Sequence, residues 1–92
     1  MPNTKSAIKR VRSSERRRLR NRWFRTQART YIKRARAEIE AGELEKAKAS
    51  VAAAVRALDK AAQKGVIHRN NAARRKSRII QNLNQALGAA ES

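Results

Sequence analysis

The chain has 92 residues, with 24 Lys or Arg against 7 Asp or Glu, which gives a formal net charge of +17 at pH 7. This length suffices for one domain over residues 1–92 and is too short for two. Cysteine is absent, which excludes disulfides and thiolate metal sites. Because like charges at this density oppose compaction, we expect a polyanion, and therefore a nucleic acid, as the partner.

The distribution of helix-breaking residues predicts an all-α fold. Proline occurs only at position 2 and glycine only at positions 42, 65 and 88, while no segment alternates apolar and polar residues as a strand would. The glycines divide the chain into three helices, expected at about residues 5–41, 43–64 and 68–87. Short connections make neighbouring helices antiparallel, so we expect a three-helix bundle.

The first predicted helix begins near Lys5, where Asn3 or Thr4 can cap it, and ends before Gly42, which can adopt a left-handed turn. Apolar residues recur three and four positions apart in its second half, so this half is expected to pack against the other helices. These residues are Phe24, Ala28, Tyr31, Ile32, Ala35 and Ile39.

The first half of this helix is expected to project beyond the bundle, because the helix would be about 50 Å long and the other two about 30 Å. Between positions 9 and 22 the only large apolar side chains are Val11 and Leu19. A helix that is cationic around its circumference cannot lie on a protein core, so it is either exposed to solvent and frayed or surrounded by phosphate. Its basic residues are Lys9, Arg10, Arg12, Arg16, Arg17, Arg18, Arg20 and Arg22.

The second and third helices each carry an apolar stripe, and Gly88 is expected to end the third. The stripes are Leu44, Ala47, Val51, Ala54, Val55, Leu58, Ala61 and Ala62, and then Ala72, Ala73, Ile79, Ile80, Leu83 and Leu87. Carboxylates gather around the first connection, at Glu38, Glu40, Glu43 and Glu45. They should face solvent, since they would repel phosphate, so the second helix is expected to face away from a nucleic acid.

Two basic clusters are the candidate RNA-binding residues, because arginine forks grip phosphate oxygens or stack on bases. The clusters are Arg16, Arg17, Arg18, Arg20, Arg22 and Arg25, and then Arg69, Arg74, Arg75, Lys76 and Arg78. If the first and third helices are parallel, both clusters converge on one side. The alternatives are a merely solvated face for the first cluster, and arginines that only cover apolar neighbours for the second.

Four other residues have less certain roles. His68 and Asn70 either touch RNA or only order the turn before the third helix. Phe24 is expected in the core, whereas Trp23 either packs there or stacks on a base.

The sequence offers no pair of nucleophile and base, no carboxylate pair in a pocket and no phosphate-cradling glycine loop, so we expect no enzymatic activity, small-molecule substrate, cofactor or metal. No apolar run approaches the roughly 20 residues of a membrane span, and no secretory signal is visible, so a cytoplasmic protein is expected. Charge and helicity also permit a histone-like DNA-packaging protein. That alternative needs a dimer interface or a groove-inserting wedge, and the sequence shows neither.

Several segments resemble the family of the bacterial small-subunit ribosomal protein S-twenty, and the resemblance spans nearly the whole chain. They are NTKSAIKR at positions 3–10, Ser14 with Glu15, RTYIKR at 29–34, IEAGE at 39–43 and KGVIHRNNAARRKSR at 64–78, the last being the most specific. Trp23 and the density of arginine from 16 to 25 depart from the family's pattern.

The resemblance implies a three-helix protein that binds small-subunit ribosomal RNA directly, takes part early in assembly and stays as a structural component. It implies a location in the cytoplasm, within that subunit, where neighbouring small-subunit proteins can contact the chain. We expect no homo-oligomer. The residues that match the family's RNA-contacting set are Lys5, Ser6, Lys9, Arg10, Arg29, Lys33, His68, Arg69, Asn70, Arg74, Arg75 and Lys76.

Overall fold

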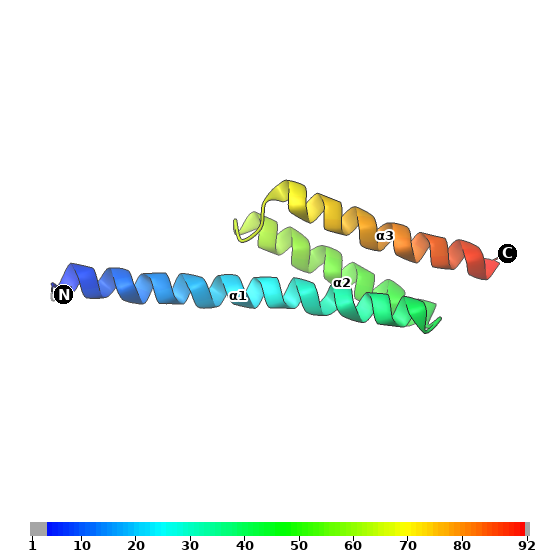
Figure 1. Ribbon diagram of the computed structural model, residues 1–92, viewed down its shortest axis with the longest axis horizontal. Helices are drawn as coiled ribbons and strands as arrows, with labels where there is room; N and C mark the ends of the chain where they lie inside the picture. Colours follow the sequence, from blue (N-terminus) through cyan, green and yellow to red (C-terminus); the bar gives the residue numbers. More distant parts are fainter. Residues whose placement is uncertain (1–3, 92) are drawn as a thin grey trace.

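The computed structural model describes residues 4–91, and this part of the chain forms three α-helices: α1 (Lys5–Glu40), α2 (Leu44–Gln63) and α3 (Arg69–Glu91). α1 and α2 form an antiparallel hairpin, and α3 turns back along α2 so that it runs in the same direction as α1 (Figure 1). The predicted all-α class and three-helix order are confirmed. The first two helices also begin and end within a residue or so of the predicted positions.

The first helix begins at Lys5 because Thr4 caps it. The Thr4 backbone is extended, and its Oγ1 accepts a hydrogen bond from the backbone N–H of Ala7 at 3.3 Å. This bond satisfies one of the N–H groups that have no partner within the helix. The prediction of Thr4 as a cap is confirmed, whereas Asn3 lies outside the described residues.

Gly42 ends α1 in a left-handed conformation, with a φ of +77°. Its N–H donates to the carbonyl of Ile39 at 3.1 Å, and the N–H of Glu43 donates to the carbonyl of Glu38 at 2.9 Å. This pair of bonds is the Schellman motif, which closes the last turn of a helix and reverses the chain. The turn therefore follows directly from the position of the glycine.

The same motif ends α2 at Gly65, whose φ is +74°. The N–H of Gly65 donates to Ala62 at 3.0 Å, and the N–H of Val66 donates to Ala61 at 2.9 Å. Val66 and Ala61 are both buried, which supplies the apolar contact that often accompanies this motif. The burial of Val66, which the sequence patterns did not predict, anchors the connection to α3.

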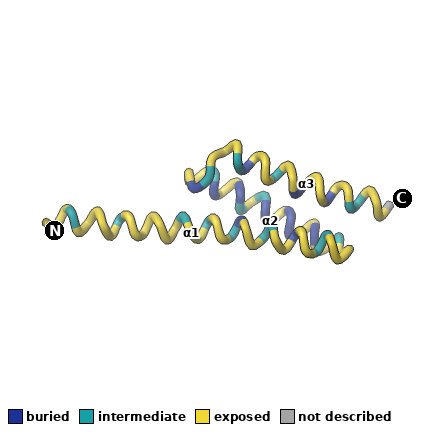
Figure 2. The backbone as a smooth tube through the Cα atoms, in the orientation of Figure 1, coloured by how far each residue is buried: buried dark blue, intermediate teal, exposed yellow. Residues whose placement is uncertain are grey.

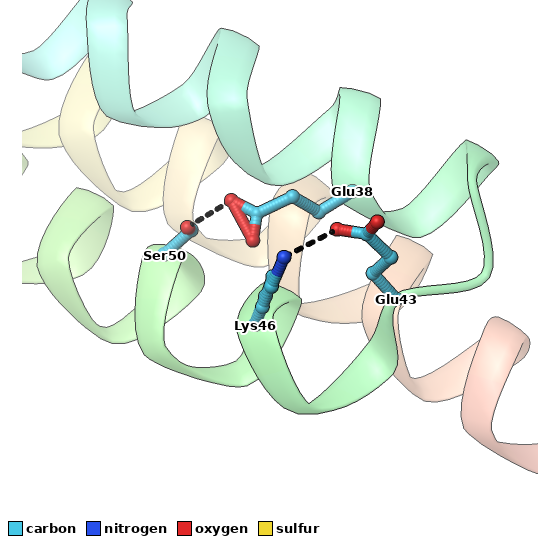
Figure 3. A network of polar contacts seen from close by, with 4 residues as sticks. All are labelled: Glu38, Glu43, Lys46 and Ser50. Atoms are coloured by element: carbon cyan, nitrogen blue, oxygen red, sulfur yellow. Dashed lines mark hydrogen bonds and ion pairs between the residues drawn. The ribbon is translucent and has the colours of Figure 1, made fainter.

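A hydrogen bond joins α1 to α2 near the hairpin turn, and an ion pair lies within the first turn of α2. The hydroxyl of Ser50 donates to the carboxylate of Glu38, and Lys46 forms an ion pair with Glu43 at 3.4 Å (Figure 3). Ser50 is buried and Glu38 half-buried. The expectation that all four glutamates around this connection face open solvent is therefore wrong for Glu38, because a small hydroxyl opposite it supplies a hydrogen bond within the helix interface.

Small side chains dominate the contact between α1 and α2. Ala28 and Ala35 of α1 stand seven residues apart and are buried. On α2, alanine and larger apolar residues each recur every seven residues, an interval that keeps one helix face directed at a partner. These two series are Ala47, Ala54 and Ala61, and Leu44, Val51 and Leu58. Methyl groups at the interface let the helices approach closely, which explains how so few large residues hold the hairpin.

α3 packs mainly on α2 and has fewer contacts with α1. Ala72, Ile79 and Leu83 are buried as predicted, and Ile79 and Leu83 join a cluster with Ala35 of α1 and residues of α2. The predicted burial of Ala73 and Ile80 is wrong, because both are exposed, Ile80 by 39%. Each follows a buried residue by about 100° around α3, where a fully enclosed bundle would have covered it.

Gly88 does not end α3, which continues through it to Glu91. The φ of Gly88 is not positive, and alanines flank it on the C-terminal side. Glycine weakens a helix but does not prevent it, and alanine is the strongest helix former. The expected end at residue 87 is therefore wrong, because the glycine lacks the left-handed turn that terminates the other two helices.

The overall shape is elongated, with extents of 67 × 22 × 16 Å. The radius of gyration is 18.0 Å, compared with about 12 Å for a compact domain of this length. The elongation comes from the first part of α1, which extends beyond the other helices. The 36 residues of the whole α1 helix span about 54 Å, whereas the 20 residues of α2 span about 30 Å. We call residues 5–22 the overhang; Figure 2 shows them almost entirely exposed while burial concentrates where the helices overlap.

The two glycine environments generate the first testable prediction. Gly65→Ala should lower the free energy of unfolding by about 1–2 kcal/mol, because an L residue is strained at a positive φ. A Cβ at Gly65 or Gly88 would meet nothing within 4 Å, so packing does not distinguish the two sites. Gly88→Ala is the matched control and should leave stability unchanged or raise it by about 0.5–1 kcal/mol. Urea unfolding followed by circular dichroism measures both, and equal effects would contradict this account of the turn.

Candidate nucleic-acid interface

The overhang exposes all of its basic side chains. Every Lys and Arg from Lys5 to Arg22 is exposed, and Glu15 is the only acidic residue among them. In the ion pairs of the described residues, the acidic partners are Glu43, Glu45 and Asp59, and none of them lies on α1. The chain therefore offers these guanidinium and ammonium groups almost no counter-charge.

A continuous concave track follows one flank of α1. Three shallow depressions lie end to end along it, the first and second sharing Ser14 and Arg18 and the second and third sharing Arg29. Over about 39 Å this track displays a basic group at nearly every turn. We define the basic track by Arg10, Ser14, Arg18, Arg22, Arg25, Arg29, Lys33 and Arg36 of α1 together with Arg75 and Arg78 of α3.

The last part of the track is a groove between α1 and α3. Arg29, Lys33 and Arg36 line one wall, Arg75 and Arg78 line the other, and Ile32 is the apolar residue among them. The groove remains open because α1 and α3 have few contacts. Five cations with no carboxylate among the lining residues repel one another, so an anion in the groove would relieve that repulsion.

The structure thus brings together Arg29 and Lys33 with Arg75 and Arg78 of the second basic cluster. The first cluster does not reach this groove, but several of its arginines line the adjoining depression, which also includes Arg29. Arg36 belongs to the same wall but was not among the predicted residues. Arg36 follows Arg29 by seven residues and Lys33 by three, and this spacing places all three on the same helix face. The spacing alone could therefore have identified it. Ser14, Asn21 and Thr26, which add hydroxyl and amide donors between the arginines, were also missed.

Arg25 has a structural contact as well as a place in the track. Its Nη2 donates to the backbone carbonyl of Val66 at 3.3 Å, which joins α1 to the connection between α2 and α3. A guanidinium has five N–H donors, so this bond leaves most of them for another ligand. Arg25 therefore fixes the point at which the overhang leaves the bundle.

His68 orders the turn before α3. Its Nδ1 accepts a hydrogen bond from the backbone N–H of Asn70 at 3.1 Å, which caps the first turn of the helix. Of the two roles considered for this pair, the ordering of the turn is thus present in the structure. Both side chains are exposed at the N-terminus of α3, beside Arg69.

Within the second basic cluster, Lys76 differs from its neighbours. It is half-buried and its Nζ lies 2.7 Å from Oδ1 of Asp59 on α2. Arg69 and Arg74 are exposed, and Arg75 and Arg78 line the groove toward α1. The cluster is therefore divided between two sides of α3, with Lys76 turned to α2.

The aromatic residues lie where the overhang meets the bundle. The rings of Trp23 and Phe24 meet edge to face, with their centroids 5.0 Å apart. Phe24 is half-buried and belongs to neither hydrophobic cluster, so its expected core position is wrong, and Trp23 is 56% exposed. Trp23 is therefore not a core residue.

The described residues contain no group of three or more His, Asp or Glu that could hold a metal ion. Their helices also include no apolar stretch long enough to cross a membrane. The main chemical feature of the described residues is the positive charge of α1 and α3.

Known proteins show extensive similarity to this chain. A family profile described as Ribosomal protein S20 matches residues 2–84. A protein of Thermomicrobium roseum named "Small ribosomal subunit protein bS20" is 57% identical over 89 residues, which are 97% of this chain and 90% of the relative. Proteins of the same name from Heliobacterium modesticaldum and Aquifex aeolicus are each 51% identical over 87 residues, covering 95% of this chain and 99% and 93% of the relatives.

The different orientations of Arg75 and Lys76 generate the second prediction. Arg75→Gln and Lys76→Gln remove one positive charge each, but only Arg75 lines the groove. Arg75→Gln should therefore elute from immobilised heparin at clearly lower salt than Lys76→Gln, because a groove contact displaces a counterion. Lys76→Gln should instead lower the free energy of unfolding slightly, by at most about 1 kcal/mol, because the lost ion pair is partly exposed. Identical elution of the two variants would show that the groove has no special role in anion binding.

Proposed function

Because the chain belongs to the ribosomal protein S20 family, we propose that it is a structural, non-catalytic constituent of the small ribosomal subunit that binds small-subunit ribosomal RNA directly and helps that RNA to assemble. Its immediate surroundings would be that RNA and neighbouring proteins of the same subunit. The proposal rests on one structural observation above all: a helix about 54 Å long that leaves its own bundle with cations on every side.

Phosphate contacts would supply most of the affinity. Each Lys or Arg that meets a phosphate displaces condensed counterions, and arginine adds two parallel hydrogen bonds to the oxygens. Successive residues of a helix point about 100° apart, so the overhang can meet phosphates on several sides at once. A protein with this arrangement holds separate RNA segments near each other by neutralising the repulsion between them.

We propose the two basic clusters and the family's matching positions as the RNA-contacting residues, apart from Lys76, whose ammonium group pairs with Asp59. The basic track would follow one RNA backbone, and the groove between α1 and α3 would hold the phosphates at its end. Arg36 is added to the set from the structure. The full set predicted from the sequence, Lys76 included, is Lys5, Ser6, Lys9, Arg10, Arg12, Arg16, Arg17, Arg18, Arg20, Arg22, Arg25, Arg29, Lys33, His68, Arg69, Asn70, Arg74, Arg75, Lys76 and Arg78.

The third prediction tests the track in RNA binding. The double variant Arg18→Gln/Arg29→Gln should bind folded small-subunit RNA more weakly, and the slope of log affinity against log salt should become shallower by about two, or one per lost phosphate contact. Filter binding or fluorescence anisotropy over a range of salt concentrations measures both. Circular dichroism verifies that the variant stays helical.

The matched control is Lys46→Gln/Lys48→Gln, which removes the same charge from α2, where both lysines pair with glutamates. This control should keep nearly the whole slope. Equal losses in the two double variants would indicate attraction by net charge alone and would refute the proposed track. Wild-type affinity for arbitrary duplex DNA as high as for the folded RNA would instead favour a histone-like DNA-packaging protein.

A further inference from the structure

The three aromatic residues of the chain line one pocket. The sequence has one Trp, one Tyr and one Phe, and Trp23, Tyr31 and Phe24 all border a single depression between α1 and α2. Residues of α2 complete its walls, with Ala53 and Ala57 as small side chains that leave room beside the rings. Such a concentration of all the available rings is not needed for the helix interface, which alanines dominate.

This pocket lies on the flank of α1 opposite the basic track. At 100° per residue, Trp23, Gln27 and Tyr31 point to one side of the helix, and Arg29, Lys33 and Arg36 point to the other. The two surfaces also use different partners, since α2 completes the aromatic pocket and α3 completes the groove. A ligand in the pocket would therefore be additional to one in the track.

The charge around the pocket is positive. Arg56 and Lys60 of α2 line it, and no carboxylate is among the lining residues. Asp59, the acid between them in sequence, is turned to α3, where it pairs with Lys76 at 2.7 Å. α2 carries two acidic residues beside four basic ones, yet the side that meets the aromatic residues presents only cations.

The aromatic surfaces are open to a planar ligand. Trp23 is 56% exposed, an unusual state for the largest apolar side chain, and its ring meets that of Phe24 edge to face. Arg34 lies 5.6 Å from the ring centre of Tyr31, which adds another cation near the rings. Gln27 contributes an amide that can both donate to and accept from the edge of a base.

We propose that this pocket holds one unstacked base of RNA against Trp23, with Arg56 and Lys60 neutralising the phosphates on either side of it. The inference rests on the proposed function, since it takes RNA as the partner. It goes further by assigning α2 to the RNA-binding surface, from which the carboxylates around the first connection had excluded it. Rings flanked by cations are the combination that binds single-stranded nucleic acid by stacking and charge.

In this arrangement α1 is held on two flanks. Phosphates occupy the basic track, and the extruded base occupies the pocket on the other side. The base contact would fix the position of the protein along the RNA, because charge alone allows it to slide.

The fourth prediction uses Trp23 as its own reporter, since it is the only tryptophan in the chain. Full-length protein is titrated with a short oligouridylate and with an abasic oligonucleotide of the same length and charge. Stacking should quench the emission of Trp23 with the base-bearing strand only. The abasic strand should bind roughly tenfold more weakly, within the range that one stacked base contributes. Both strands can order the overhang, so the difference between them isolates the base.

Variants separate stacking from charge. By anisotropy with labelled strands, Trp23→Ala should lose roughly tenfold in affinity for the base-bearing strand and nothing for the abasic one, and Trp23→Phe should recover part of that loss. Leu19→Ala is the matched control, because Leu19 is 62% exposed one turn earlier on α1 and lies outside the pocket. Arg56→Gln/Lys60→Gln should weaken both strands equally.

Equal affinity of wild-type protein for the two strands, or an unchanged Trp23→Ala variant, would overturn the base pocket while leaving salt-dependent binding of folded RNA intact. Emission that responds to neither strand would likewise overturn it and leave the pocket as a surface for another protein. Failure of the wild-type protein to bind folded small-subunit RNA at all would instead refute both the pocket and the proposed function.

Discussion

The rest of the structure depends on one constraint, which is the mutual repulsion of the cations in the overhang. From position 5 to position 22, six pairs of Lys or Arg stand three or four residues apart, whereas Glu15 makes only two pairs of opposite charge. Each such pair changes helix stability by about 0.2–0.5 kcal/mol, unfavourably for like charges. The overhang is also too far from α2 and α3 to gain stability from apolar burial. A helix of this kind needs counter-charge from outside the chain, and phosphate supplies it in the proposed complex.

The bundle supports the overhang by giving α1 a rigid base. Alanines spaced seven residues apart let α1 and α2 pack closely, and the two Schellman motifs set the positions at which the chain reverses. Because α1 continues without a break from this base, its first half needs only to extend an existing helix and avoids the cost of nucleation. The bond from Arg25 to Val66 ties the junction to the α2–α3 connection. Thus the core positions the cationic surfaces that would bind phosphate in the proposed complex.

The sequence was sufficient to predict the three helices, the overhang and the basic clusters, because glycine positions, apolar spacing and charge density are all local properties. It was insufficient where the outcome depended on how three helices share contacts. Ile80 is exposed because α3 packs mainly on α2, and Glu38 is half-buried because Ser50 happens to lie opposite it. Gly88 stays helical because no left-handed turn is formed there. The aromatic pocket likewise could not be predicted from the sequence. Its residues come from two helices, and its positive charge depends on Asp59 turning away to pair with Lys76.

The most direct test of the central claim is amide hydrogen exchange, residue by residue, with and without folded small-subunit RNA. In the free protein at low salt, residues 5–20 should exchange nearly as fast as an unfolded chain, while the buried half of α1 around Ala28 and Ala35 is protected. Binding of the RNA should then protect residues 5–20. Strong protection of these residues in the free protein would mean that the overhang is stable without a polyanion, and this would contradict the account.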